Sequence, residues 1–261
     1  TAIKQKKQKE GETMKNYVLE ACVDSAESAF AAEAGGAVRL ELCADLIVGG
    51  TTPSICLLKE IRKKSDIRIH VLIRPRFGDF CYTEHETNII EEEIKMFKDA
   101  GADGIVTGAL CPDGTLDCKK MERFVKAAGD RWVTLHRAFD VCADPYRTLD
   151  QARDLGISCI LTSGQKNSAL EGKELLRDLQ KKAGETIQIL AGGGIDADVI
   201  PKLYQETGIT SYHMSGKITL DSPMMYRKED VSMGLPAFSE YQLFRTSKEK
   251  ISDAKNVLKN L

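Results

Sequence analysis

Eight short apolar segments recur along this sequence, and a longer amphipathic stretch follows nearly every one of them. Apolar runs of this length that are rich in β-branched residues predict buried strands, and the stretches between them predict helices. Strand and helix in regular alternation are typical of parallel sheets. The predicted strands cover residues 17–23, 37–43, 67–75, 104–110, 132–139, 159–164, 187–194 and 211–216.

Helix start and stop signals support the same alternation. The residues that precede or open the predicted helices are Ser25, Pro53, Thr83, Asp117, Asp144 with Pro145, Ser168 and Asp196, and glycines follow near most helix ends. Eight such units predict an α/β fold, a (β/α)₈ barrel of the TIM type. A doubly wound open sheet has the same alternation of strands and helices but usually contains fewer strands. No GxGxxG motif, which would indicate dinucleotide binding in such a sheet, follows the first strand here.

The chain of 261 residues, 42% of them hydrophobic, is large enough for one barrel domain, which we expect to cover residues 14–261. Residues 1–13 are polar and contrast with the apolar segment that follows Met14. They predict a flexible tail, an artificial extension or part of a targeting segment. The atypical segment after the eighth strand, from about residue 217, is expected to fold over the barrel or to form a subunit contact.

Charge and cysteine content exclude several classes of function. With 37 basic and 39 acidic residues the net charge is −2, which gives no general attraction for nucleic acid or anionic membranes. No run of 18 apolar residues and no apolar secretory signal occurs, so a cytosolic location is expected. The 8 cysteines contain no CxxC pair, which predicts free thiols and argues against a structural zinc site. Binding of a soft metal by thiols distant in sequence stays open.

Ionisable residues repeatedly occupy the strand positions whose side chains should face the barrel interior. They are Glu20, Glu41, Arg74, His136 and His213. Because unpaired buried charges are costly, these groups must pair with one another, bind water or contact a ligand. Functional groups of (β/α)₈ barrels collect at the carboxyl ends of the strands, so we predict a polar pocket there.

In the stretch VTLHRAFD, His136 occupies a strand position whose side chain should face the barrel interior, and Asp140 lies in the loop that follows. The side chain of Arg137 should point to the other side of the strand, where it is expected to brace the wall. An enzyme acting on a small anionic or sugar-phosphate-like substrate would use Glu20, Glu41, His136 and Asp140 as acid, base or orienting groups. Arg74 and Arg76 suit a carboxylate or phosphate oxyanion. Structural ion pairs, such as one between Arg74 and Glu41, are the alternative reading.

Glycine-rich turns after the seventh and eighth strands form a second candidate anion site. The residues expected to contact a ligand there are Gly193, Gly194, His213, Ser215 and Gly216, beside a helix that begins near Asp196. Backbone N–H groups at such turns bind phosphate in many barrels. Glycines also simply permit tight turns, and both interpretations stay open. The loops over residues 49–54 and 76–83 are candidates for a lid.

Several segments, in order from about Tyr17, resemble the CutC copper-homeostasis family: EACVDSAESAFAAEAGGAVRLELCADLIVGGTTPS, LIRPRFGDFCYT, TLHRAFD, LTSG, AGGGI and YHMSGK. The resemblance implies a cytosolic (β/α)₈ barrel, a homo-oligomer, a role in copper tolerance or trafficking, and Cu(I) bound by Cys22 and Cys43. Cu(I) is soft and prefers thiolates, and neighbouring strands lie about 4.8 Å apart, so a shared site is feasible. Two buried structural thiols are the alternative.

Overall fold

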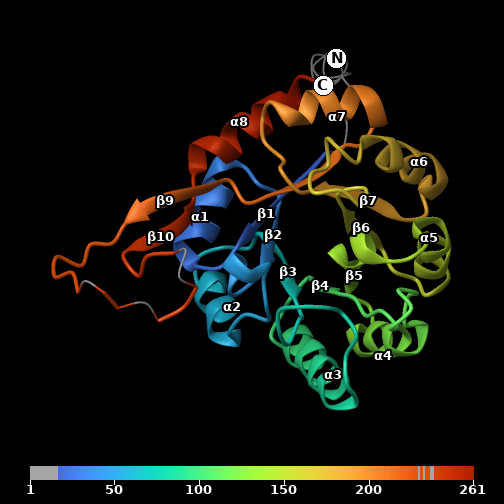
Figure 1. Ribbon diagram of the computed structural model, residues 1–261. Coiled ribbons are helices and arrows are strands. Elements are labelled where there is room, and N and C mark those ends of the chain that lie inside the picture. The colour runs from blue at the N-terminus through green and yellow to red at the C-terminus, as the bar shows by residue number, and fades with distance from the viewer. Residues whose placement is uncertain (1–16, 229, 232, 236–237) are drawn as a thin grey trace, which may run out of the picture.

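Eight parallel strands close into a barrel in the computed structural model, which describes residues 17–228, 230–231, 233–235 and 238–261 (Figure 1). Strand neighbours follow chain order, and the last strand pairs with the first. The predicted (β/α)₈ fold is confirmed. The tail predicted for residues 1–13 lies outside the described residues. The strands are β1 Val18–Val23, β2 Arg39–Leu42, β3 Arg68–Leu72, β4 Gly104–Thr107, β5 Trp132–Leu135, β6 Cys159–Thr162, β7 Gln188–Gly192 and β8 Ser211–Met214.

A ring of helices surrounds the strands (Figure 1). Their starts follow from side-chain caps: the Thr83 hydroxyl accepts from Glu86 N–H while the Glu86 carboxylate accepts from Thr83 N–H, and Asp144 caps two N–H groups beside Pro145. The helices are α1 Ala26–Gly35, α2 Ile55–Arg62, α3 Glu84–Asp99, α4 Cys118–Ala128, α5 Pro145–Asp154, α6 Lys173–Ala183 and α7 Val199–Thr207.

Helix α6 begins four residues later than the Ser168 signal predicts, at Lys173 instead of Ala169. The Ser168 hydroxyl caps only a turn, and Ala169 N–H donates to the Gly193 carbonyl, which ties this segment to the end of β7. Gly172 then passes the Ser163 carbonyl so closely that an added Cβ would lie 1.9 Å from that oxygen. Tertiary contacts therefore override the local start signal.

The barrel wall separates an apolar outer layer from a polar interior. Leu19, Ala21, Leu40 and Leu42 are buried within the main hydrophobic core, whereas the alternate residues Glu20, Cys22, Arg39 and Glu41 lie side by side in the β1–β2 register. The alternation that the sequence predicts for these strands is therefore present. It brings charged groups from β1, β2 and β8 into the barrel interior.

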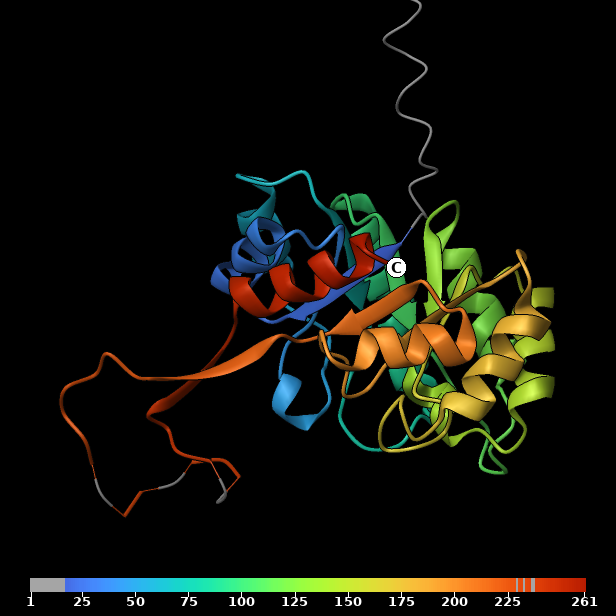
Figure 2. The same cartoon turned by 90° about the horizontal axis from the view of Figure 1, so that it is seen from above.

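The segment after β8 differs from the repeated units. Strands β9 (Lys217–Asp221) and β10 (Gln242–Thr246) form an antiparallel hairpin that projects away from the barrel, and helix α8 (Lys248–Lys259) returns to lie beside α1 (Figure 2). Helix α8 thus covers the barrel as predicted, and the end of β10 also contacts α1. In the described part of the chain, every helix is too short or too polar to cross a membrane.

Candidate functional site

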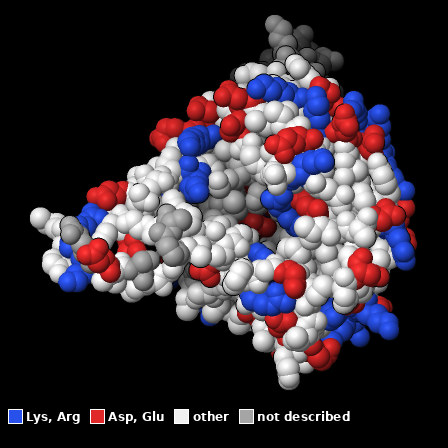
Figure 3. Space-filling model, viewed as in Figure 1, with Lys and Arg blue, Asp and Glu red and all other residues white. Residues whose placement is uncertain are grey.

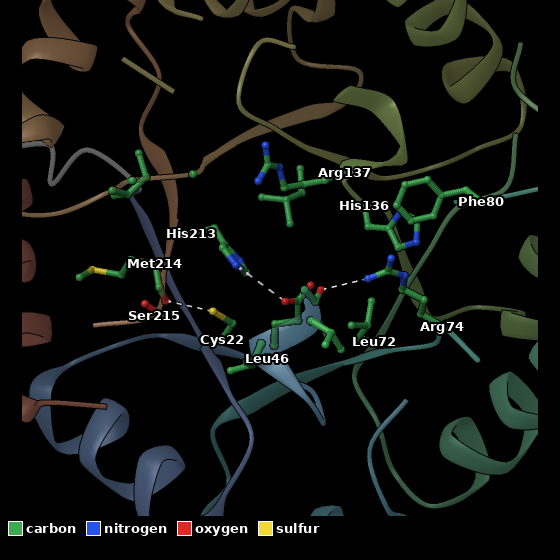
Figure 4. A pocket seen from close by; sticks show the side chains of 17 residues that line it. Cys22, Leu46, Leu72, Arg74, Phe80, His136, Arg137, His213, Met214 and Ser215 are labelled. Carbon is green, nitrogen blue, oxygen red and sulfur yellow. Dashed lines mark hydrogen bonds and ion pairs between the residues drawn. The ribbon is translucent and has the colours of Figure 1, made fainter. Parts of the chain in front are cut away.

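A cavity of about 450 Å³ opens at the carboxyl ends of the strands, where the sequence predicts a polar pocket. The surface is hollowed near the centre of the helix ring, with basic and acidic residues around it (Figure 3). Figure 4 shows side chains converging from opposite sides of the barrel. The residues that line the cavity are Cys22, Glu41, Leu46, Val48, Gly49, Leu72, Arg74, Phe80, His136, Arg137, Leu161, Gly193, Gly194, Ile195, His213, Met214 and Ser215.

A buried ionic network involving Glu20 lies beside this cavity. The Glu20 carboxylate pairs with Arg39 through one oxygen and with Nδ1 of His213 at 2.7 Å through the other. Burial alone would raise the pKa of Glu20, but the charges of Arg39 and His213 bring that pKa down to about 2. Burial opposes charge on His213 as well, yet Cys22, Glu41 and Glu20 hold its pKa well above the usual value. Glu20 itself is not among the cavity-lining residues.

Glu41 and Cys22 line the cavity, and Cys43 lies buried beside them. The Cys43 thiol donates to the Glu41 carboxylate at 3.4 Å, and the Cys22 thiol donates to the Met214 carbonyl at 3.7 Å. Both thiols belong to one apolar cluster with Leu72. Burial, together with Glu41 and Cys22, holds the pKa of Cys43 well above its usual value.

Three ligand-type side chains also meet here: one atom each from Glu20, Glu41 and His213 lies within 4.8 Å of the other two. Carboxylate oxygens and an imidazole suit a hard or borderline divalent ion better than Cu(I). Because Glu20 is already neutralised by Arg39, this trio has its charge balanced by protein groups. A soft metal would find its preferred donors in the two thiols instead.

The opposite wall carries Arg74 and His136 (Figure 4). The Arg74 guanidinium donates to the carbonyls of Gly50 at 3.0 Å and Gly78 at 2.8 Å, and so it ties together the two loops predicted to form a lid. No ion pair of Arg74 occurs within the described ranges, so the pair with Glu41 that the sequence allows does not form. The Phe80 ring packs against both Arg74 and His136.

Arg76, the second arginine of the IRPR motif, does not line the cavity. It pairs with Glu86 at 2.5 Å and Asp79 at 3.0 Å, and it stacks over Tyr82. The strand β3 ends at Leu72, and the chain turns between Arg74 and Arg76, so strand parity no longer applies to the second arginine. These contacts make Arg76, Asp79 and Tyr82 parts of the loop structure.

The end of VTLHRAFD is a 3₁₀ turn, η2 (Arg137–Val141), and not a continuation of β5. It places Arg137 on the cavity wall, where the sequence expected only a brace. Asp140 lies outside the cavity lining: its carboxylate accepts from Arg137 Nε at 2.7 Å, from the Thr162 hydroxyl at 2.5 Å and from Ser163 N–H at 3.0 Å. Asp140 is therefore a positioning group that orders the loop after β6.

The glycine-rich turns lie on a third side of the cavity. Gly193, Gly194 and Ser215 line it, while Gly216 lines a smaller neighbouring hollow together with Asp196, Asp198 and Asp253. The Asp196 carboxylate accepts from Asp198 N–H at 3.0 Å and from Val199 N–H at 2.9 Å. The start of α7 is thus capped by the protein's own carboxylate, and the hollow beside it is lined by three aspartates together with Lys217 and Lys250.

Sequence reasoning missed Arg137, Phe80 and Arg39 as parts of the site. The inner parity of Arg39 on β2 was visible in the sequence, and its pairing with Glu20 follows from the β1–β2 register. Phe80 and Arg137 come from a loop and a 3₁₀ turn, where no period indicates side-chain direction. Apolar Leu72, Leu161 and Met214 complete the lining.

Comparison with known proteins gives a consistent family signal. The sequence profile of the CutC family matches residues 17–218. A family protein CutC of Bacteroides fragilis is 43% identical over 244 residues, which cover 92% of this chain and 96% of the relative. The copper homeostasis protein cutC homolog of Mus musculus is 40% identical over 246 residues, covering 94% of this chain and 90% of the relative.

Solved structures agree with the fold. A crystal structure of a copper homeostasis protein CutC from Streptococcus agalactiae superposes with a TM-score of 0.73 at 31% identity, covering 77% of this chain and 99% of that chain. A thiamine phosphate pyrophosphorylase from Pyrococcus furiosus has a TM-score of 0.55 at 14% identity, with coverage of 94% of this chain and 96% of its own. At that identity the likeness is one of fold alone.

Proposed function

We propose, because the chain belongs to the CutC family, that it serves copper homeostasis by binding Cu(I) through Cys22 and Cys43. The observation that carries this proposal is the pair of free, buried thiols in one side-chain cluster, one of which lines the cavity. Cu(I) is a soft ion that prefers thiolates. Two sulfurs beside an open cavity offer such an ion both ligands and a route of entry.

His213 fits as a nitrogen donor to the same ion, because it lines the cavity next to Cys22. Binding would require the thiols to lose their protons, and the raised pKa of Cys43 makes that loss unfavourable without the metal. The metal would thus displace protons on entry, and affinity should fall as the pH falls.

Anaerobic Cu(I) titration against a competing chelator tests this proposal. The wild-type protein should withdraw Cu(I) from the chelator, and the double variant Cys22→Ser plus Cys43→Ser should lose this ability because both soft ligands are gone. Cys159→Ser is the matched control, since Cys159 is also a free, buried thiol but lies in a separate cluster with Leu161 and Leu190. Unchanged Cu(I) affinity in the double variant would overturn the proposal.

A cytosolic location and a homo-oligomeric state belong to the same proposal. Free thiols persist most readily in a reducing compartment, and all 8 cysteines are free. The projecting β9–β10 hairpin exposes large apolar side chains, including Met225 at 96% and Met233 at 82% exposure, which is a surface suited to a second subunit.

A second candidate function is an enzyme that acts on a small anionic or sugar-phosphate-like substrate in the same cavity. The specific observation that favours it is that Glu41, His213, Arg74 and His136 all line one cavity, with His213 on the side opposite Arg74 and His136 (Figure 4). A carboxylate and an imidazole can move protons, while an arginine and a second imidazole hold an oxyanion. Glu20 and Asp140 would then position His213 and Arg137.

Proton exchange in D₂O provides a test of the second candidate. The protein is incubated with triose and pentose phosphates and with small hydroxy acids, and ¹H NMR follows the loss of C–H signals or the appearance of products. Activity should fall by about a hundredfold or more in Glu41→Gln, as expected for a general acid or base. Glu60→Gln, on the exposed face of α2, is the control. An equal rate in both variants would refute the role of Glu41.

A further inference from the structure

Arg74 is a buried cation whose charge no carboxylate of the described chain neutralises. Only 8% of the residue is exposed, and its hydrogen-bond partners are the carbonyls of Gly49, Gly50 and Gly78. Its Nε–H has no acceptor among the described residues. Arg39 and Arg76, by contrast, each pair with carboxylates. The loop carbonyls hold the Arg74 guanidinium in place and leave its positive charge uncompensated.

His136 supplies a second donor without a partner on the same wall. Its Nδ1 accepts from Ala138 N–H at 3.2 Å, so in the neutral ring the proton is on Nε2. This Nε2 has no partner in the described part of the protein, and the residue is 5% exposed. Burial and the charge of Arg74 lower the pKa of His136 to about 3, which keeps the ring neutral near pH 7.

These two groups lie together, because the Phe80 ring contacts both: 4.8 Å separates the Phe80 and His136 ring centroids, and the Arg74 guanidinium carbon lies 5.0 Å from the Phe80 centroid. Leaving a buried donor or cation without a partner costs free energy. An oxyanion bound between them would accept from the neutral imidazole and neutralise the arginine. Both side chains line the cavity, so a ligand there can meet them.

The remaining walls favour the same location for a negative charge. Near the glycine turns, Asp196 already occupies N–H groups that begin α7, and the neighbouring hollow sets the lysines Lys217 and Lys250 against three carboxylates, those of Asp196, Asp198 and Asp253. Glu41 also lines the cavity, from the neighbouring strand β2, and is suited to accept hydrogen bonds from hydroxyl groups. The cavity thus offers the cationic Arg74 and the carboxyl group of Glu41 within about 450 Å³, a volume that suits a small metabolite.

We infer that Arg74 and His136 form the binding site for the oxyanionic group, carboxylate or phosphate, of a small hydroxylated metabolite. This inference rests on the second candidate function and locates its anion on this wall, away from the glycine turns. It does not depend on Cu(I) binding, because neither residue is a proposed copper ligand.

Side-chain NMR of the 4 histidines in copper-free protein tests the site. Glycerate and glycerol 3-phosphate are the carboxylate and phosphate probes, and glycerol is the neutral control. At least one of the two anions should shift the His136 Nε2–H signal, whereas glycerol should not. Arg74→Gln should weaken anion binding about tenfold or more, since hydrogen bonds to charged groups are the stronger ones. Arg76→Gln removes an arginine two residues away and should leave the affinity unchanged.

The wild-type measurement stands even if Arg74→Gln fails to fold, because the His136 signal reports on binding directly. Absence of a shift with both anions at high concentration would overturn the inference, as would equal affinity in Arg74→Gln. If the anions bind but no substrate is turned over, the proposed enzymatic function is wrong, whereas the anion-binding site at Arg74 and His136 is supported. If a substrate is turned over equally well in Arg74→Gln, the enzymatic function is supported and the proposed anion-binding site is wrong.

Discussion

Replacing Glu20 with alanine is expected to lower the free energy of unfolding by about 3–5 kcal/mol, because breaking a buried ion pair leaves uncompensated charge. Glu20 is 2% exposed and holds two cationic partners, Arg39 and His213. Without it, Arg39 stays charged inside the barrel, and the proton on His213 loses its nearest carboxylate. Urea-induced unfolding, followed by circular dichroism, measures this loss.

The control and the rescue variant separate this effect from simple loss of side-chain volume. Glu60→Ala removes an exposed carboxylate of α2 that pairs with Lys63, the residue after the helix, and such pairs contribute little. The double variant Glu20→Ala plus Arg39→Met should be more stable than Glu20→Ala alone, because the second substitution removes the unpaired cation. If the double variant is no more stable than the single one, the charge argument fails.

The barrel could be predicted from sequence because each strand and helix carries its own local pattern. Thr83, Asp117 and Asp144 cap the helices that they were expected to begin. The start of α6 could not be found this way, because contacts from Gly172 to the loop after β6 decide it. Local signals identify elements reliably where no distant contact competes with them.

The candidate site was predictable only along the strands. Glu41, His136 and His213 lie on the inner parity and line the cavity as expected. Beyond the strand ends, the alternation of side-chain direction no longer applies. There the Arg76 side chain points away from the cavity, whereas Arg137 lines it. Charge pairing could not be predicted either, since nothing in the sequence indicates that Arg39 pairs with a carboxylate whereas Arg74 pairs with none among the described residues.

Protein stability should be greatest near pH 6.5, because the buried His70 and His136 and the half-buried His213 respond to pH in opposite directions. Burial lowers the pKa of His70 to about 4, and burial with Arg74 lowers that of His136 to about 3. Below pH 6.5 these two histidines therefore bind protons in the unfolded chain but not in the folded protein. The free energy of unfolding consequently decreases as the pH is lowered. His213, whose folded pKa is raised, binds its proton more tightly when folded, so its contribution is lost as the pH rises above 6.5.

Between pH 6.5 and 4.5, His70 and His136 together should lower the free energy of unfolding by about 4 kcal/mol, since one pKa unit corresponds to 1.36 kcal/mol. Glu20 adds to it below about pH 4.5, because its pKa of about 2 stabilises the fold only while the carboxylate is charged. Urea unfolding at several pH values gives the profile.

The variant His136→Gln isolates one of the two histidines, because glutamine keeps a polar side chain but does not titrate. Between pH 6.5 and 4.5 this variant should lose about 2 kcal/mol less of its free energy of unfolding than the wild-type protein does. His85→Gln, on the exposed face of α3, is the matched control for the substitution itself. The comparison uses the pH dependence and not the absolute stability, so a packing defect in the variant does not obscure it. An unaltered acid slope in His136→Gln would mean that the folded protein protonates His136 as readily as the unfolded chain does, which contradicts the lowered pKa of this residue.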